Sequence, residues 1–150
     1  MKSFKQHILE KLKVSKPIYK LFPKTKGELQ EMIKNEIFKN GYRCSLNHID
    51  VSKITDMSKL FSFSNFYGDI SGWDVSNVID MGYMFAYSKF NGDISNWDVS
   101  NVKRFDTMFR NSEFNGDISN WQINPVAKRR MYGMFINSPL ENNTPDWYIK

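Results

Sequence analysis

The chain repeats one motif three times: GDISGWDVSNV at residues 68–78, GDISNWDVSNV at 92–102 and GDISNWQIN at 116–124. The copies are 24 residues apart, so Trp73, Trp97 and Trp121 occupy equivalent positions. A fixed period of about 20–50 residues is typical of a solenoid, in which each coil buries its apolar side chains against its neighbours. The repeat therefore predicts a stack of coils with the tryptophans in its core.

The apolar spacing within one copy predicts the structure of each coil. Ile70, Trp73 and Val75 follow the L-x-x-L-x-L rhythm of a leucine-rich repeat, which predicts a short strand. From Val78 to Phe85 the apolar residues recur three or four positions apart, which predicts a short helix. We therefore expect an α/β solenoid of leucine-rich-repeat-like coils with short strands and short helices, capped by an N-terminal helix.

The longer pattern G-D-I-S-x-W-D-V-S-N-V-x-x-M-x-x-M-F resembles the BspA-like leucine-rich repeats, also called the DUF285 repeat family. The segment from Phe22 through Met57 resembles the N-terminal cap of that family. Its members are known from bacterial surface proteins, mycoplasma lipoproteins and gut phages, so the resemblance implies a binding or display role without known chemistry. We identify no signal peptide and no lipid-anchored cysteine of the lipoprotein kind, and therefore do not expect attachment to a cell surface.

The composition fits one domain with a continuous core, because 41% of the 150 residues are hydrophobic. Cys44 is the single cysteine, so an intramolecular disulfide is impossible. No apolar run approaches the roughly 18 residues of a membrane span, and lysines interrupt every candidate secretory segment. We expect a soluble protein located in the host cytoplasm or in a virion.

The positive charge is concentrated in the first third of the chain. Residues 1–45 contain 11 Lys and Arg against 4 Asp and Glu, whereas residues 46–150 contain 10 against 12. Thr25 and Glu28 have capping-box spacing and Gly41 is a helix stop, which predicts a capping helix between them. We divide the chain into a leader helix and linker (1–16), an N-terminal helical cap (17–45), and repeats with an irregular C-terminal cap (46–150).

The leader is predicted to be a short amphipathic helix with Phe4, Ile8 and Leu12 on one stripe and Leu9 beside it. Such a helix packs on its own solenoid, binds a partner or lies on an anionic membrane. Residues 1–10 resemble the leaders that direct internal proteins into the heads of large tailed phages. Those leaders begin M-K-[ST]-[YF] and are processed after an apolar-x-Glu site, which here is Ile8-Leu9-Glu10.

The last repeat departs from the pattern. Pro125 enters, and Trp147 follows Trp121 by 26 residues rather than 24. We expect an irregular closing segment in which Trp147 and Tyr148 cover the far end of the core.

The sequence offers no catalytic constellation. His7 and His48 fall in the leader and the cap, and the chain lacks a Ser/His/Asp order, a glycine-rich phosphate loop and a Cys/His zinc spacing. The recurring aspartates, such as Asp69 and Asp93, suggest either a metal-binding or acidic docking stripe or residues that accept turn N–H groups. We favour the turn role. We therefore predict a non-enzymatic protein with no catalytic residue, no metal and no cofactor.

A basic cluster is the best candidate surface for binding a protein partner. One period of 24 residues aligns Arg104 with Lys128, which predicts a shared patch. Its members are Lys103, Arg104, Lys128, Arg129 and Arg130. The alternative is a solvated face, and nucleic-acid binding is expected only through the basic leader. We conclude that the chain is a phage-encoded protein-binding repeat module or, alternatively, a packaged or structural phage head protein delivered by its leader.

Overall fold

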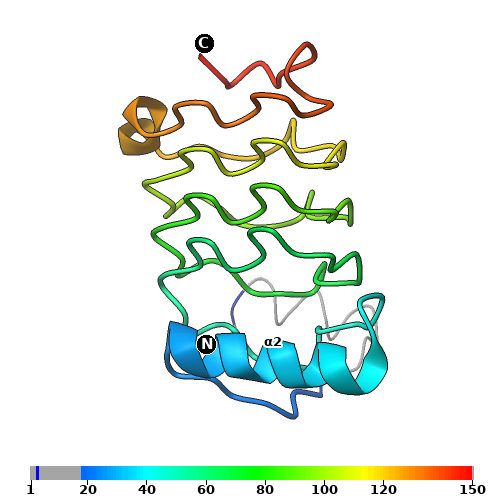
Figure 1. Ribbon diagram of the computed structural model, residues 1–150. Helices are drawn as coiled ribbons and strands as arrows, with labels where there is room; N and C mark the ends of the chain where they lie inside the picture. Colours follow the sequence, from blue (N-terminus) through cyan, green and yellow to red (C-terminus); the bar gives the residue numbers. More distant parts are fainter. Residues whose placement is uncertain (1–2, 4–17, 150) are drawn as a thin grey trace.

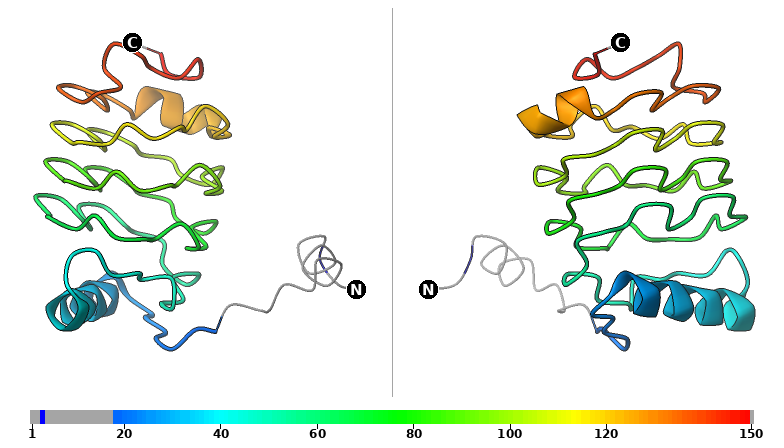
Figure 2. Two further views of the ribbon diagram at one scale, coloured as in Figure 1. Left: turned by 90° about the vertical axis from the view of Figure 1, so that its right-hand side faces the viewer. Right: turned by 60° about the vertical axis from the view of Figure 1, so that its left-hand side comes forward.

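The computed structural model describes residues 3 and 18–149 and arranges the repeats as a stack of coils (Figure 1). Its helices are α2, Lys26–Asn40, and the short 3-10 helix η1, Pro125–Arg129. Helix α2 lies across one end of the stack, and Figure 2 shows the same layering from two other sides. The leader prediction lies outside the described residues; it concerns Phe4, Ile8, Leu9, Glu10 and Leu12.

The expected α/β solenoid with a strand and a helix in every coil is wrong. Residues 18–149 form no strand and share isolated β-bridges: Leu21–Ile49, Ser45–Asp69, Asp56–Asp80 and Asp80–Arg104. Two tight turns divide the expected strand, because the carboxylate of Asp69 accepts the N–H of Ser71 at 2.9 Å and that of Asp74 accepts the N–H of Ser76 at 3.1 Å. The pieces between these turns are too short for a strand ladder.

The expected short helices are replaced by turns, which we call the turn wall: residues 57–63, 81–87, 105–111 and 131–137. Here N–H groups alternate between two kinds of acceptor. Met84 N donates to Met81 O at 3.2 Å within its coil, whereas Phe85 N donates to Met108 O in the next coil at 2.9 Å. Tyr83, with φ 59°, is left-handed and interrupts any right-handed helix.

The backbone–backbone hydrogen bonds that join coils along the turn wall all run in one direction. N–H groups of one coil donate to carbonyl groups of the next, as Met57 donates to Asp80 and Met81 to Arg104 at 2.9 and 3.0 Å. Each coil therefore presents a row of N–H donors toward the C-terminal end of the stack.

The core consists of stacked rings. One ladder has centroid spacings of 5.7, 5.7 and 5.9 Å and contains Phe61, Phe85, Phe109 and Phe135. The tryptophans of the motif lie inside, as the repeat predicts; Trp97 is 4% exposed. Its Nε1 donates to Ile70 O of the preceding coil at 3.3 Å, and Trp147 Nε1 repeats this bond to Ile118 O at 2.9 Å. Each indole therefore fills the core and joins two coils.

Helix α2 confirms the capping helix expected from the sequence. The Thr25 side chain accepts the N–H of Glu28 at 3.2 Å, and the helix ends at Gly41, whose φ is 81°. Leu29 and Ile33 are buried in the same core as the coils. The helix thereby covers apolar side chains at its end of the stack. No helix of the described residues is long and apolar enough to cross a membrane.

The two extra residues of the last repeat are accommodated in η1, before the turn wall resumes. Phe105 N donates to Arg130 O at 2.7 Å, the bond that Met81 N makes to Arg104 O one coil earlier. Arg130, rather than Lys128, is therefore equivalent to Arg104. The alignment by 24 residues fails after Pro125 because the insertion precedes the wall.

The aspartates of the turns make stability depend on acid pH. Hydrogen bonds from Ser95 lower the pKa of Asp93 below its ordinary value of 3.8, and hydrogen bonds from Ser119 lower that of Asp117. Because a carboxyl with a depressed pKa stabilises the fold only when ionised, this contribution is complete above about pH 4 and lost below it. We expect the melting temperature to fall as pH decreases from about 4.5 to 2.5, and less steeply in Asp93→Asn/Asp117→Asn. An equally steep fall in the double variant would contradict this role.

Candidate partner-binding surface

The basic residues predicted as a binding surface divide into two groups. Arg104 and Arg130 lie on neighbouring coils and share one carboxylate: their Nε atoms are 3.0 and 3.6 Å from Asp106 Oδ2. Arg104 also places Nη1 3.2 Å from Asp80 Oδ2. These two arginines are brought together as expected, but with carboxylates that compensate their charge.

Lys103, Lys128 and Arg129 form the second group. All three are exposed, and the described residues give none of them a carboxylate partner within 4.0 Å. Lys128 and Arg129 form the last turn of η1, which projects from the side of the stack in Figures 1 and 2. Two of the three uncompensated cations of the predicted patch therefore lie on η1.

Arg104 is held in a network within the fold. Its side chain is 34% exposed, and the hydrogen bond to Asp106, followed by that to Asp80, raises the pKa of the guanidinium. The network joins residues of two neighbouring coils. Arg104 thus contributes to coil–coil contacts, and its role differs from that of the exposed cations on η1.

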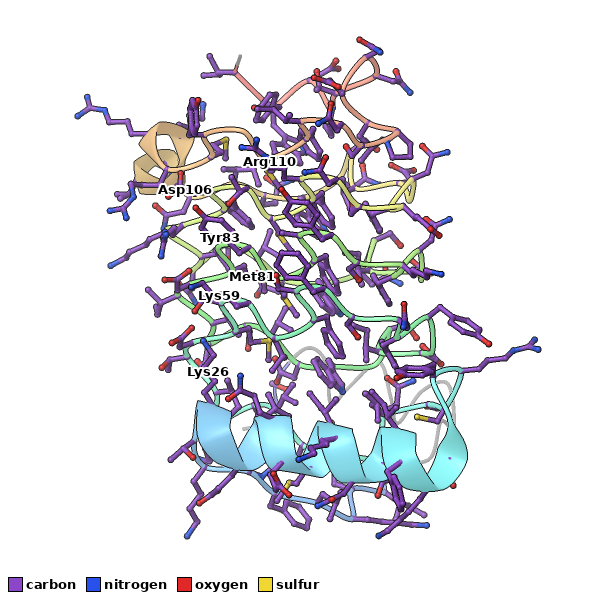
Figure 3. All side chains as sticks on the ribbon, in the orientation of Figure 1. Lys26, Lys59, Met81, Tyr83, Asp106 and Arg110 are labelled. Atoms are coloured by element: carbon purple, nitrogen blue, oxygen red, sulfur yellow. The ribbon has the colours of Figure 1, made fainter. Side chains whose placement is uncertain are left out.

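Tyr83 lies between two cations on the turn wall. Lys59 Nζ is 5.8 Å and Arg104 Cζ is 6.0 Å from the ring centroid, distances at which a cation is attracted to an aromatic face. Figure 3 shows Lys59, Tyr83 and Asp106 following one another along the same side of the stack. Sequence reasoning did not find this arrangement, although Lys59 and Tyr83 are one period apart.

The sequence analysis also did not predict a pair of exposed aromatic side chains. Phe63 and Tyr87 occupy equivalent positions of the turn wall and stack with their centroids 4.5 Å apart. The available signal was their 24-residue separation. They follow the buried Phe61 and Phe85 by two residues, a spacing that in an extended chain would place them on the buried side.

A pocket of about 530 Å³ lies beside η1 at the C-terminal end of the stack. Lys128 and Arg129 line it together with Tyr132 and Gly133 of the last turn wall and Tyr148 of the closing segment. Among the described residues, no group of three or more His, Cys, Asp or Glu is arranged to hold a metal ion. The pocket therefore combines uncompensated cations with aromatic rings, a composition suited to binding acidic or amphipathic groups.

Residues 28–147 match the family described as "Mycoplasma protein of unknown function, DUF285". The chain belongs to the DUF285 family. The DUF285 match begins within α2 and ends at Trp147, so it includes the coils, η1 and all five basic residues. Searches of curated proteins and of solved structures give no match.

In this DUF285 chain, the effect of charge reversal on stability should distinguish Arg104, which lies in the ion-pair network, from the exposed cations on η1. Arg104→Glu places a third carboxylate beside Asp80 and Asp106, and we expect it to lower the free energy of unfolding by about 1–2 kcal/mol. The matched reversal Arg129→Glu, on the exposed turn of η1, should change it by less than about 0.5 kcal/mol. Urea unfolding of both variants measures the difference. Equal effects would show that the network contributes nothing to the stack.

Proposed function

We propose that this protein is a non-enzymatic protein-binding module encoded by a phage. The observation that carries the proposal is the contrast between the two sides of the turn wall. The inward positions keep their side-chain type, as in the buried Met84, Met108 and Met134. An outward row changes from Phe63 through Tyr87 to Asn111 and Asn137, none of which is buried. A stack that repeats its core while varying its surface is suited to presenting specific side chains to a partner.

The partner is a protein with an acidic surface that docks on Lys103, Lys128 and Arg129. These three cations are exposed and lack carboxylate partners among the described residues, so their charge is available for attraction at a distance. This attraction is screened over about 8 Å at physiological ionic strength. Recruitment should therefore depend on salt. The complex forms in the host cytoplasm in this proposal.

Capture and kinetics test the proposal. The tagged protein is expressed in its native host, cross-linked partners are identified, and association with the purified partner is measured at two salt concentrations. We expect the reversal of Lys103, Lys128 and Arg129 to glutamate to slow association about tenfold at low salt. The control variant Lys53→Glu/Lys89→Glu changes exposed lysines elsewhere on the stack. The proposal would be overturned if none of the captured partners bound the purified protein.

The second candidate is a packaged or structural component of a phage head. It is favoured by residues 1–10, which resemble the leaders of internal phage head proteins and contain an Ile8-Leu9-Glu10 site. In this case the destination is the virion, and the coil stack is cargo delivered by the leader. Mass spectrometry of purified virions, with a search for peptides that begin at Lys11, tests both delivery and processing after Glu10.

Deletion of residues 1–10 separates targeting from folding. The family match begins at residue 28, and α2 already covers the first coil, so we expect the melting temperature of the shortened protein to change by no more than about 2 °C. Its incorporation into virions should be lost. Collapse of the shortened protein would make the leader a part of the fold, and normal packaging would remove its targeting role.

A further inference from the structure

The last turn wall presents three N–H donors for which the described residues supply no acceptor. In the preceding coil, Phe105, Thr107 and Phe109 donate to the carbonyl groups of Arg130, Tyr132 and Met134 at 2.7–2.9 Å. The equivalent donors one coil later belong to Met131, Gly133 and Phe135. By the repeat they face away from the preceding coil, toward the C-terminal end of the stack. The three residues are largely buried, and no described residue accepts their N–H groups.

The fourth donor of the same row shows which acceptor fits. Asn137 N donates to Glu141 Oε2 at 3.0 Å, where Asn111 N of the preceding coil donates to Ile136 O at 2.9 Å. A carboxylate oxygen therefore takes the place of a backbone carbonyl on this edge. It also confirms the outward direction of the row.

The three donors lie in the pocket beside η1. Met131, Gly133 and Phe135 line it, and Lys128 and Arg129 contribute positive charge to the same lining. Glu141 is the acidic residue of the lining, and its carboxylate is engaged by Asn137. The pocket of about 530 Å³ thus joins a row of hydrogen-bond donors to two uncompensated cations. Both features attract the same chemistry, namely carbonyl and carboxylate oxygens.

We propose that this pocket binds an acidic, extended segment of a partner protein, which adds to the stack in the manner of a further coil. Alternate carbonyl groups of the segment accept from Met131, Gly133 and Phe135. Its carboxylates pair with Lys128 and Arg129. This inference rests on the proposed protein-binding function and names the site and chemistry of docking. Main-chain bonds supply affinity, and the charge pairs select acidic segments.

Amide exchange in the free, full-length protein is the first test. The amides of Met131, Gly133 and Phe135 should exchange with deuterium at least about tenfold faster than those of Phe105, Thr107 and Phe109. Asn137, bonded to Glu141, is the internal control and should be protected. Equal protection of both rows would mean that the donors already have acceptors, and would overturn the proposal.

Titration with defined peptides is the second test. The probes are a blocked hexapeptide of alternating glutamate and threonine, its lysine–threonine counterpart, and glutarate, which carries the charge without peptide carbonyls. We expect the glutamate peptide to shift the amide resonances of Met131, Gly133 and Phe135. The affinity for the glutamate peptide should fall about tenfold in Lys128→Glu/Arg129→Glu, because that variant loses two weak ion pairs. The affinity should stay unchanged in the control variant Lys53→Glu/Lys89→Glu.

Several outcomes would overturn the site. Equal binding of the lysine peptide, equal amide shifts with glutarate, or shifts confined to other residues would each do so. The result is distinguishable from failure of the proposed function. If a native partner binds the Lys128→Glu/Arg129→Glu variant with unchanged affinity, this pocket is not the docking site, but the proposed binding function still holds. A protein that binds the glutamate peptide here but has no partner in its host retains the site and loses the function.

Discussion

We expect Trp97→Ala to lower the free energy of unfolding by about 3–5 kcal/mol, which is enough to unfold a domain of ordinary stability. Trp97 is 4% exposed in the central repeat, and its ring lies 6.3 Å from that of Phe85. Removal of the indole leaves a cavity between coils and takes away one of the two donors to Ile70 O, the other being Trp73 N at 3.2 Å. Chemical unfolding of the purified variant measures the loss.

Two further substitutions control this experiment. Trp97→Phe keeps a ring in the core but loses the indole N–H, so it should be intermediate between the wild type and Trp97→Ala. Lys89→Ala changes an exposed residue of the preceding turn and should alter stability by less than about 0.5 kcal/mol. A Trp97→Ala variant as stable as Lys89→Ala would contradict the packing of the tryptophans between the coils.

Gly68→Ala is expected to have the second largest effect, a loss of about 3 kcal/mol or more. A Cβ at this position would collide with the carbonyl oxygen of Cys44 and approach the ring of Phe66 to 2.7 Å. The backbone is fixed there, because Asp69 N donates to Cys44 O at 3.2 Å. One of the two segments must therefore move, and the bond between cap and coil stretches.

Gly72→Ala is the matched control for Gly68→Ala. Its Cβ would meet only the side chain of Asn47, at 3.1 Å, and that side chain can shift if the bond that its Oδ1 accepts from Gly72 N at 2.9 Å is weakened. Thermal unfolding of both variants should show a large decrease for Gly68→Ala and a small one for Gly72→Ala. Similar decreases would mean that the loss of glycine flexibility, rather than the collision with Cys44, determines the effect.

The repeat predicted the stacking of the coils and the burial of their aromatic residues because both depend on apolar side chains that recur every 24 residues. It did not predict the backbone. Spacing of three or four residues is shared by helices and by consecutive turns, and the left-handed conformation of Tyr83 has no signal in a tyrosine. The strand prediction was wrong for a related reason. Asp69 and Asp74 accept hydrogen bonds from nearby N–H groups, and these local turns compete with the hydrogen-bond ladder of a strand.

The candidate surface was predicted in part. The five basic residues were found from their charge and from the 24-residue alignment, but neither shows which of them have partners. Asp106 follows Arg104 by two residues, and this spacing could have indicated the ion pair. The equivalence of Arg104 and Arg130 depends on where η1 absorbs two residues, which apolar spacing does not specify. The row of donors requires the direction of each backbone bond and is invisible in the sequence.

The one-way bonds of the turn wall give the stack a particular response to mechanical force. These bonds lie along the stacking axis, so tension applied between the two ends of the stack acts on every interface in series, and the weakest interface opens first. Each interface then opens as a separate event. One released coil of 24 residues supplies roughly 80 Å of extended chain, so the molecule lengthens in equal steps and limits the load on whatever it holds.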